Sequence, residues 1–363
     1  MQPNAHMHSE TSTAPRPSQL LTPALAIETA SGDEWERYVL GHPQATSAHL
    51  WGWGDVLEET FGHTPHFFLA RRAGVVCGAL PLVAMKSLLF GRFLASMPYL
   101  NYGGLLADDQ PAEDALLARA VALAGALHLT SIEFRHREQH AAPSVTKSHK
   151  VTMELDLSRG EEGLWKSFDP KLRNQIRKPQ RSGLLCEIDP PGALEAFYAV
   201  FSRNMRDLGT PVYPPSFFRA VRRAFPGHTH ILVVKKGETP VAAGFLFHFR
   251  DRVEIPWASS IRDFNSLSPN NLLYWDSIRF AISEGARLFD MGRSTPDEGT
   301  YKFKAQWGAK PAALHWQYWL APGEEIPERN PKNRKFQIAI QLWQRLPLDI
   351  AETLGPVIAR GLP

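Results

Sequence analysis

The sequence predicts an α/β protein that contains two copies of one structural unit, because two distant segments repeat the same pattern. Residues 67–85 read FFLARRAGVVCGALPLVAM, and residues 231–249 read ILVVKKGETPVAAGFLFHF. Each segment has an apolar strand, a basic pair, a glycine turn and a second apolar strand, which is the pattern of a β-hairpin. Gly78 and Gly244 lie near the start of the second strand in their respective copies.

The elements that follow each hairpin also match. Amphipathic helices are expected at about 111–128 and about 269–285, and each is followed by a short strand. Both strands place an acid two or three residues before an arginine, as Glu133 and Arg135 and as Asp290 and Arg293. The two glycines are 166 residues apart and the two acids are 157 residues apart, so nearly equal offsets indicate a duplication.

A different kind of segment separates the two copies. VTMELDL alternates apolar and polar residues and predicts a half-buried strand. Asp169 is suited to cap a helix that begins at Pro170, and Pro179 is expected to end that helix early. After a turn at Gly183, the sequence predicts a strand at LLCEI and helices at about 194–208 and 216–225.

Length and composition are those of an ordinary globular chain. At about 150 residues per domain, 363 residues suggest two domains. A hydrophobic fraction of 44% and a charged fraction of 21% exclude a disordered or fibrous chain. Because 40 Lys and Arg face 37 Asp and Glu, the net charge of +3 does not indicate a nucleic-acid binder, and any anion recognition must come from local clusters.

The two cysteines, Cys77 and Cys186, lie in apolar runs and are expected to be small buried residues, not a disulfide framework. The apolar runs are shorter than the roughly 18 residues that span a bilayer. Residues 1–22 lack the features of a signal peptide. We therefore expect a cytoplasmic protein.

Composition divides the chain into four parts. Residues 1–23 are expected to be a disordered leader, and residues 24–150 and 151–322 form the two predicted domains. Residues 323–363 form a hydrophilic linker and an amphipathic helical tail that is broken at Pro347. Docking of this tail on the body is the favoured interpretation, and peripheral membrane contact or a protein partner are the alternatives.

Several familiar sites are absent from the sequence. It contains no phosphate-binding loop, no nucleophile elbow and no C-x-x-C pair. Histidine pairs such as His63 and His66 lack a clear carboxylate or cysteine that would complete a metal site. We expect neither a metal nor a redox cofactor.

Residues 289–320, FDMGRSTPDEGTYKFKAQWGAKPAALHWQYWL, form the most informative stretch. A strand and a loop precede a short helix, on which Phe303 and Trp307 share one face. Lys302 and Lys304 cannot both share that face. One lysine is therefore expected to be held against the body at the sheet edge where open α/β folds bind ligands, and a solvated lysine is the alternative.

The segment KLRNQIRKPQR, at 171–181, predicts a basic helix. Arg173 and Arg177 are four residues apart and face the same way, so they could clamp phosphates of a nucleotide-linked acceptor or of tRNA. A solvated basic face is the alternative interpretation.

A combination of motifs covers roughly residues 25–320. The second copy closes with D-x-G-R-S at 290–294, G-x-Y-x-F-K at 299–304 and W-G-A at 307–309. Further motifs are NYGG at 101–104, KLRNQIRK at 171–178, LGTPVY at 208–213 and SPNNLLYW at 268–275. This combination resembles the FemAB (FemABX) family. The W-x-R-L-P-L tail at 343–348 is similar to the branch associated with exosortase/PEP-CTERM and exopolysaccharide loci.

The resemblance implies two tandem GNAT-like domains with mixed sheets flanked by helices, and acyl transfer to an amine. In this family a Phe-Lys pair lies at the reacting centre, and it falls on Phe303 and Lys304 here. Lys304 is therefore the expected catalytic residue. When an amine attacks an ester or thioester, a fixed cation stabilises the negative charge on the carbonyl oxygen by about 3–4 kcal/mol.

The resemblance also suggests substrate contacts. Tyr102 and Tyr213 are expected to contact the acceptor, and Arg293 joins the two basic-helix arginines as a candidate anion contact. Core packing is an equal alternative for one further aromatic candidate, Trp257. The remaining candidate substrate-binding residues are Asn101, Tyr301 and Phe303.

Three functions stay open on the sequence. The first is transfer of an aminoacyl group from aminoacyl-tRNA to an amine of a cell-wall or exopolysaccharide precursor. The second is an acyl-CoA-dependent N-acyltransferase, although SSIRDFNSLSPNN at 259–271 lacks the glycines of a pyrophosphate loop. The third is a non-catalytic protein that holds a glycan or nucleotide-sugar within an export system.

Overall fold

The computed structural model describes residues 24–87, 91–143, 145–147, 150–326 and 334–362, and the predicted leader at 1–23 lies outside them. The first sheet contains β1 (Leu25–Thr29), β2 (Thr64–Arg72), β3 (Val75–Ser87), β4 (Gly91–Ala95), β5 (Leu106–Ala107), β6 (Ser131–His136), β7 (Val145–Lys147) and β15 (His315–Leu320). The second contains β8 (Val151–Asp156), β9 (Leu184–Ile188), β10 (Thr229–Lys236), β11 (Thr239–Phe249), β12 (Arg252–Ser260), β13 (Leu288–Ser294) and β14 (Lys310–Ala313).

The helices of the first half are α1 (Gly32–Gly41), α2 (Gly52–Phe61) and α3 (Gln110–Ala126), with the short helix η1 (Ser47–His49). Those of the second half are α4 (Gly160–Ser167), α5 (Pro170–Arg181), α6 (Ala193–Leu208), α7 (Pro215–Ala224), η2 (Arg262–Leu267), α8 (Pro269–Ser283) and α9 (Gly299–Ala305). The tail forms α10 (Arg334–Trp343) and α11 (Leu348–Ala359).

The two sheets have the same strand order, which confirms the predicted duplication. The first runs β1-β2-β3-β4-β6-β15-β7, and the second, read from its opposite end, runs β9-β10-β11-β12-β13-β8-β14. In both, the fourth and fifth strands are parallel and their neighbours are antiparallel. The helix that crosses between those parallel strands is α3 in the first copy and α8 in the second.

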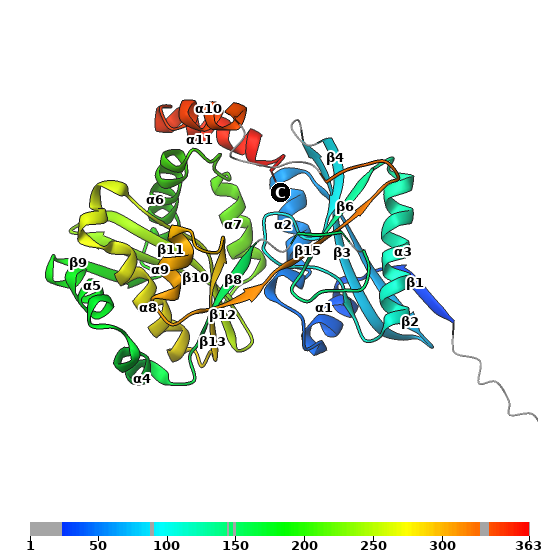
Figure 1. Ribbon diagram of the computed structural model, residues 1–363, viewed down its shortest axis with the longest axis horizontal. Coiled ribbons are helices and arrows are strands. Elements are labelled where there is room, and N and C mark those ends of the chain that lie inside the picture. Colours follow the sequence, from blue (N-terminus) through cyan, green and yellow to red (C-terminus); the bar gives the residue numbers. More distant parts are fainter. Residues whose placement is uncertain (1–23, 88–90, 144, 148–149, 327–333, 363) are drawn as a thin grey trace, which may run out of the picture.

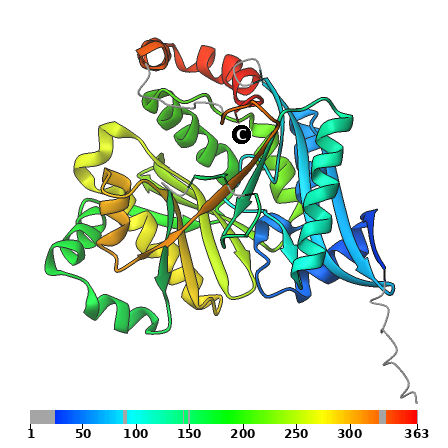
Figure 2. The same cartoon turned by 45° about the vertical axis from the view of Figure 1, so that its right-hand side comes forward.

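The copies exchange one strand with each other. β8 follows the first copy in sequence but pairs with β13 in the second sheet. Reciprocally, β15 follows the second copy but pairs with β6 and β7 in the first sheet. Figures 1 and 2 show β15, in orange, running out of the second half into the first. Residues 315–320, which the sequence analysis placed in the second domain, thus complete the first sheet.

The paired glycines have a common structural reason. A Cβ atom on Gly78 would lie 2.8 Å from Leu116 Cδ1 on α3. A Cβ atom on Gly244 would lie 2.9 Å from Ile255 Cδ1 and 3.3 Å from Leu273 Cδ1 on α8. In each copy the missing side chain lets the crossing helix pack closely against the hairpin.

A single apolar core joins the two halves. It contains Trp35 of α1, Trp53 of α2, Phe197 of α6 and Phe217 of α7, together with one face of each sheet. α3 covers the opposite face of the first sheet, and α8 covers that of the second. The interface between the halves is therefore packed like a protein interior, and a site built across it has fixed walls.

Two local predictions have different outcomes. Asp169 and Pro170 begin α5 as expected, but Pro179 does not end it, because the helix continues to Arg181. A proline removes one backbone hydrogen bond, and this loss is small in a last turn that ends two residues later. Both cysteines are free; Cys77 is buried, as predicted, whereas Cys186 is only half-buried.

The tail docks on the body, as the favoured interpretation predicted. Arg206 Nη1 donates to the carbonyl of Leu346 at 2.9 Å, and the hydroxyl of Tyr99 donates to the carbonyl of Arg360 at 2.7 Å. α11 buries its small residues Ala351, Gly355 and Ala359. Large apolar side chains of the tail are exposed instead, namely Ile338, Leu342, Ile350, Leu354, Val357 and Ile358.

Membrane contact through this exposed apolar face stays a prediction. Within the described ranges, no helix is both long enough and apolar enough to cross a bilayer.

Candidate active site

A cavity of about 180 Å³ lies between the two halves of the protein. Its walls bring together five residues that the sequence analysis selected, namely Asn101, Tyr102, Tyr213, Trp257 and Arg293. The other lining residues are Ser47, Ala48, Trp53, Tyr99, Leu100, Phe247, Glu254 and Pro256. Both copies contribute to this cavity, so neither half could form it alone.

The parallel strands β12 and β13 create the opening for this cavity. They pair from Arg252 with Leu288 to Glu254 with Asp290, and no further pair follows. Beyond that point the strands separate, and Trp257 of β12 and Arg293 of β13 line the space. The last paired residues are both acids, so the sheet divides where two carboxyl groups lie on adjacent strands.

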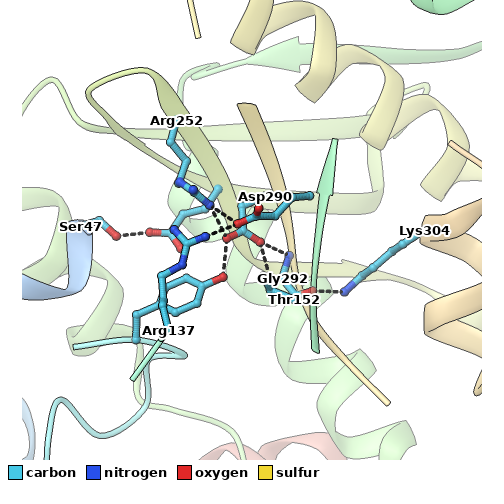
Figure 3. Close-up of polar contacts among 10 residues, drawn as sticks. Ser47, Arg137, Thr152, Arg252, Asp290, Gly292 and Lys304 are labelled. Carbon is cyan, nitrogen blue, oxygen red and sulfur yellow. Dashed lines mark hydrogen bonds and ion pairs between the residues drawn. The ribbon is translucent and has the colours of Figure 1, made fainter. Parts of the chain in front are cut away.

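Asp290 is the centre of a buried hydrogen-bond network. Its Oδ2 accepts from the hydroxyl of Tyr102 at 2.5 Å and lies 3.3 Å from Nη1 of Arg252. Its Oδ1 accepts from the hydroxyl of Thr152 at 2.6 Å and from the backbone N–H of Gly292 at 2.8 Å. Figure 3 shows Asp290 between the arginine on one side and the Gly292 backbone on the other. A fully buried carboxyl group with four donors is held rigidly in one orientation.

The same network extends through Glu154 of β8. Arg252 and Arg137 both donate to Glu154 Oε1, at 2.6 Å and 2.5 Å. Arg137 belongs to the first half, and β8 belongs to the second sheet. The ion pair between Arg137 and Glu154 therefore joins the two halves beside the cavity.

Glu254 lines the cavity and was missed by the sequence analysis. Ser47 donates a short hydrogen bond to its carboxyl group. Burial, followed by the nearby charge of Asp290, raises the pKa of Glu254 to about 7, against the opposing effects of Ser47 and Arg252. A carboxyl group with this pKa can accept and release a proton near neutral pH.

The acid and the arginine of the repeated motif pair with each other in the first copy but not in the second. In the first copy Arg135 Nη2 lies 2.7 Å from Glu133 Oε1, and each side chain is 1% exposed. In the second copy Asp290 is engaged by the other donors, and Arg293 forms none of the ion pairs found in the described part of the chain. The guanidinium of Arg293 lies 4.7 Å from the ring centroid of Trp316 and is exposed to the cavity.

Lys304 is the lysine that the fold holds against the body, as expected for one of the two. Its side chain is 7% exposed, whereas Lys302 is exposed. Lys304 Nζ donates to the carbonyls of Gly292 at 3.0 Å and Arg293 at 3.1 Å, so it lies behind the cavity wall and not among the lining residues. Burial lowers the pKa of Lys304 to about 8; the nearby cation of Arg293 acts in the same direction, and the charge of Asp290 opposes it.

The remaining predicted residues lie away from the cavity. Phe303 packs against Tyr274, with ring centroids 5.1 Å apart, and Tyr301 contacts the same apolar core. Arg177 of α5 lies 5.0 Å over the ring of Trp165. Arg173, on the same helix, does not line the cavity either.

A larger cavity of about 460 Å³ also lies between the halves, lined by Arg135, His136, Arg137, Arg250 and Arg252, among others. Two of these arginines, Arg137 and Arg252, are already paired with Glu154. In the described ranges, no three His, Cys, Asp or Glu side chains come together as a metal site would require.

The duplicated mixed sheets, the crossing helices and the parting of β12 from β13 define a tandem GNAT-like α/β protein. Residues 166–305 match the family described as acetyltransferase (GNAT) domain, which indicates an acyltransferase domain in the second half. The matched range contains α5, the separating strands and Lys304.

Solved structures support the tandem arrangement over most of the chain. FemX is 15% identical, with a TM-score of 0.62 over 88% of this chain and 100% of that one. A tandem GNAT protein from the clavulanic acid biosynthesis pathway is 14% identical, with a TM-score of 0.55 over 84% and 100%. L-PGS from Bacillus licheniformis is 11% identical, with a TM-score of 0.54 over 88% and 99%. At these identities the likeness establishes the fold. No curated protein matches the sequence.

Proposed function

We propose that this protein transfers an acyl group, specifically an aminoacyl group from aminoacyl-tRNA, to an amine of a cell-wall or exopolysaccharide precursor. The observation that carries this proposal is the position of Glu254. Its carboxyl group, with a pKa near 7, lines a small aromatic cavity at the point where β12 and β13 separate. Acyl transfer to an amine needs a base there, because an ammonium group cannot attack a carbonyl carbon.

The proposed reaction proceeds by direct transfer. The ammonium form of the acceptor gives one proton to Glu254, and the free amine attacks the acyl carbonyl carbon. A carbon–nitrogen bond forms, the ester carbon–oxygen bond of the donor breaks, and the leaving oxygen takes a second proton from the former ammonium group. Glu254 then releases its proton to solvent, so that one proton is released in total.

Lys304 is the proposed cation of this site. Its ammonium group has three protons, and two of them are donated to the carbonyls of Gly292 and Arg293. Because Lys304 lies behind the cavity wall, its role rests on the family resemblance: we propose that its third proton stabilises the carbonyl oxygen of the donor as negative charge develops there. With a pKa near 8, the group is largely protonated at neutral pH, so it carries the positive charge that this role needs.

The choice of donor depends on the segment between β12 and α8. It contains η2 and has no glycine, and α8 begins at Pro269, which has no backbone N–H to offer a phosphate. These features disfavour a CoA pyrophosphate at this helix. We propose that Arg173 and Arg177 of the basic helix α5 contact the tRNA backbone instead. A reaction with aminoacyl-tRNA would place the protein in the cytoplasm.

A second candidate is an acyl-CoA-dependent N-acyltransferase, which is favoured by the match of residues 166–305 to the acetyltransferase domain. In that reaction the carbon–sulfur bond breaks and a free thiol leaves.

Donor binding separates the two candidates. Purified protein is titrated with labelled mixed aminoacyl-tRNA and with labelled acetyl-CoA at a fixed moderate salt concentration, because phosphate contacts weaken steeply as salt rises. The proposal requires aminoacyl-tRNA binding that unlabelled aminoacyl-tRNA displaces. Binding of acetyl-CoA alone, with thiol release when an amine is added, would replace the proposal with the second candidate.

A further inference from the structure

The cavity between the halves contains two groups of opposite charge that do not neutralise each other. Arg293 makes no ion pair within the described ranges, and Glu254 receives a hydrogen bond from Ser47. Both side chains line the same space of about 180 Å³. A guanidinium in a cavity lined in part by aromatic residues gains most from a carboxylate, which matches its paired donors.

Arg293 is unpaired within the described ranges even though an acid, Asp290, lies three residues before it on the same strand. Its counterpart in the first copy, Arg135, forms a buried ion pair with Glu133 from the same short strand. In the second copy, the corresponding acid, Asp290, accepts hydrogen bonds from Tyr102, Thr152 and the Gly292 backbone instead. In the first copy the acid and the arginine of the motif pair with each other. In the second copy they do not, so the guanidinium of Arg293 is open to a ligand.

Other residues of the cavity lining are suited to an ammonium group. Glu254 supplies a carboxyl group, and Tyr99, Tyr102, Tyr213 and Trp257 supply aromatic rings around the same space. Aromatic faces attract cations through the ring quadrupole, and a carboxylate beside them completes an ammonium site. The volume of about 180 Å³ lies below the roughly 300–1,000 Å³ of pockets for drug-sized ligands, so only a small group enters.

We infer that the acceptor is an amine that also carries a carboxylate, as a free amino acid or as the amino-acid end of a larger precursor. Its carboxylate contacts Arg293, and its amino group points toward Glu254. This inference rests on the proposed acyl transfer and names the substrate class of the acceptor. Arg293 then selects the acceptor by charge, and Glu254 removes the proton from the amine that reacts.

The test uses small-molecule binding without any acyl donor. A panel of free amino acids, their carboxamides and the corresponding acids without the amino group is titrated. The intrinsic tryptophan fluorescence, to which the cavity residues Trp53 and Trp257 contribute, is followed. The inference requires that an amino acid bind about tenfold more tightly than its carboxamide. It also requires that Arg293→Gln reduce this preference to about one.

Matched variants separate the role of Arg293 from a general effect. Arg262→Gln removes an exposed arginine of η2 that lies outside the cavity lining, and it should leave the preference unchanged. Arg293→Lys keeps the charge but loses the paired donors, so it should give an intermediate preference. Thermal unfolding of each variant confirms that it is folded. Dipeptides with a free amino group distinguish a free amino acid from a precursor end, since a precursor site would also accept them.

Two outcomes would overturn the inference. One is equal binding of amino acids and carboxamides by the unmodified protein, or no binding of either at tens of millimolar. The other is a preference that persists in Arg293→Gln. Either result would still be compatible with acyl transfer to an amine that carries no carboxylate. Conversely, failure of transfer with every donor would remove the proposed function without altering the binding preference.

Discussion

The hydroxyl of Tyr102 donates to Oδ2 of Asp290 at 2.5 Å, and this hydrogen bond joins the two halves of the protein at the wall of the cavity. Tyr102 follows β4 in the first copy, and Asp290 is the last residue of β13 that pairs with β12. The acid of the first copy, Glu133, also accepts from a tyrosine, Tyr318, but in addition pairs with Arg135 of its own strand. Asp290 pairs instead with Arg252 of the neighbouring strand, and Arg293 is left open to the cavity.

Removing this hydroxyl should destabilise the protein. In Tyr102→Phe, a fully buried carboxylate loses one of its donors, which should lower the free energy of unfolding by about 1–3 kcal/mol. Tyr38→Phe is the matched control, because the hydroxyl of Tyr38 donates to Asp108 at an exposed site. Urea unfolding measures both. Equal losses in the two variants would contradict the structural role assigned to Tyr102.

The two copies should respond differently to loss of their arginines. Arg135→Met leaves Glu133 buried without its ion partner and should cost about 3–5 kcal/mol in the free energy of unfolding. Arg293→Met removes an exposed guanidinium that has no ion pair in the described ranges, and it should cost less than about 1 kcal/mol. The same unfolding series checks both. A larger loss in Arg293→Met would mean that its charge stabilises the fold and does not await a ligand.

The rate of acyl transfer should have a bell-shaped dependence on pH. Glu254 must be deprotonated to accept a proton, so the rate should rise as pH increases through about 7. Lys304 must be protonated, so the rate should fall as pH increases through about 8. Glu254→Gln should slow the reaction and abolish the acidic limb. An acidic limb unchanged in that variant would assign the base to another group.

Glu254 should also make the free energy of unfolding depend on pH, and here the free energy falls as pH rises, whereas the rate rises. Because the folded protein raises the pKa of Glu254 from 4.5 to about 7, the folded state binds more protons than the unfolded state between these values. This group therefore makes the protein less stable as pH rises from about 4.5 to 7. Glu254→Gln should flatten that part of the stability profile, and an unchanged slope would contradict the raised pKa.

The exposed apolar face of the tail should bind lipid bilayers, as the predicted membrane contact requires. Leu354 and Val357 are 46% and 70% exposed on α11, and burying such side chains in a bilayer yields about 25 cal/mol per Å². The unmodified protein should float with vesicles of phosphatidylglycerol and phosphatidylethanolamine. Leu354→Glu with Val357→Glu should stay in the soluble fraction. Flotation that does not depend on these residues, or no flotation, would contradict the prediction.

The sequence predicts the duplicated elements well because their signals are local. The hairpins, the paired glycines and the crossing helices each leave a pattern within about 20 residues, and the structure has all of them. The strand exchange leaves no such signal. β8 and β15 have the alternation of any half-buried strand, and which sheet they join depends on contacts far along the chain.

The candidate site was predicted in part for a similar reason. Of the five selected lining residues, all but Trp257 belong to motifs that resemble the family. Glu254, in contrast, is a lone acid in an alternating strand and resembles a solvent-facing position. Its place beside Asp290 follows only from the parallel pairing of β12 with β13. Arg173 and Arg177 were selected from their charge pattern and from the KLRNQIRK motif, neither of which fixes the orientation of α5 relative to the cavity.

The most direct test of the account measures amide formation with labelled mixed aminoacyl-tRNA as donor and amino-group-bearing envelope precursors as acceptors. Mild alkali hydrolyses the remaining ester, so only label in an amide bond is counted. We predict alkali-stable product with the unmodified protein and with Lys302→Met, which changes an exposed lysine on the same helix as Lys304. Lys304→Met should fold normally and lose most turnover. Equal turnover in Lys304→Met and Lys302→Met would contradict the assigned role of Lys304 and, with it, the proposed active site.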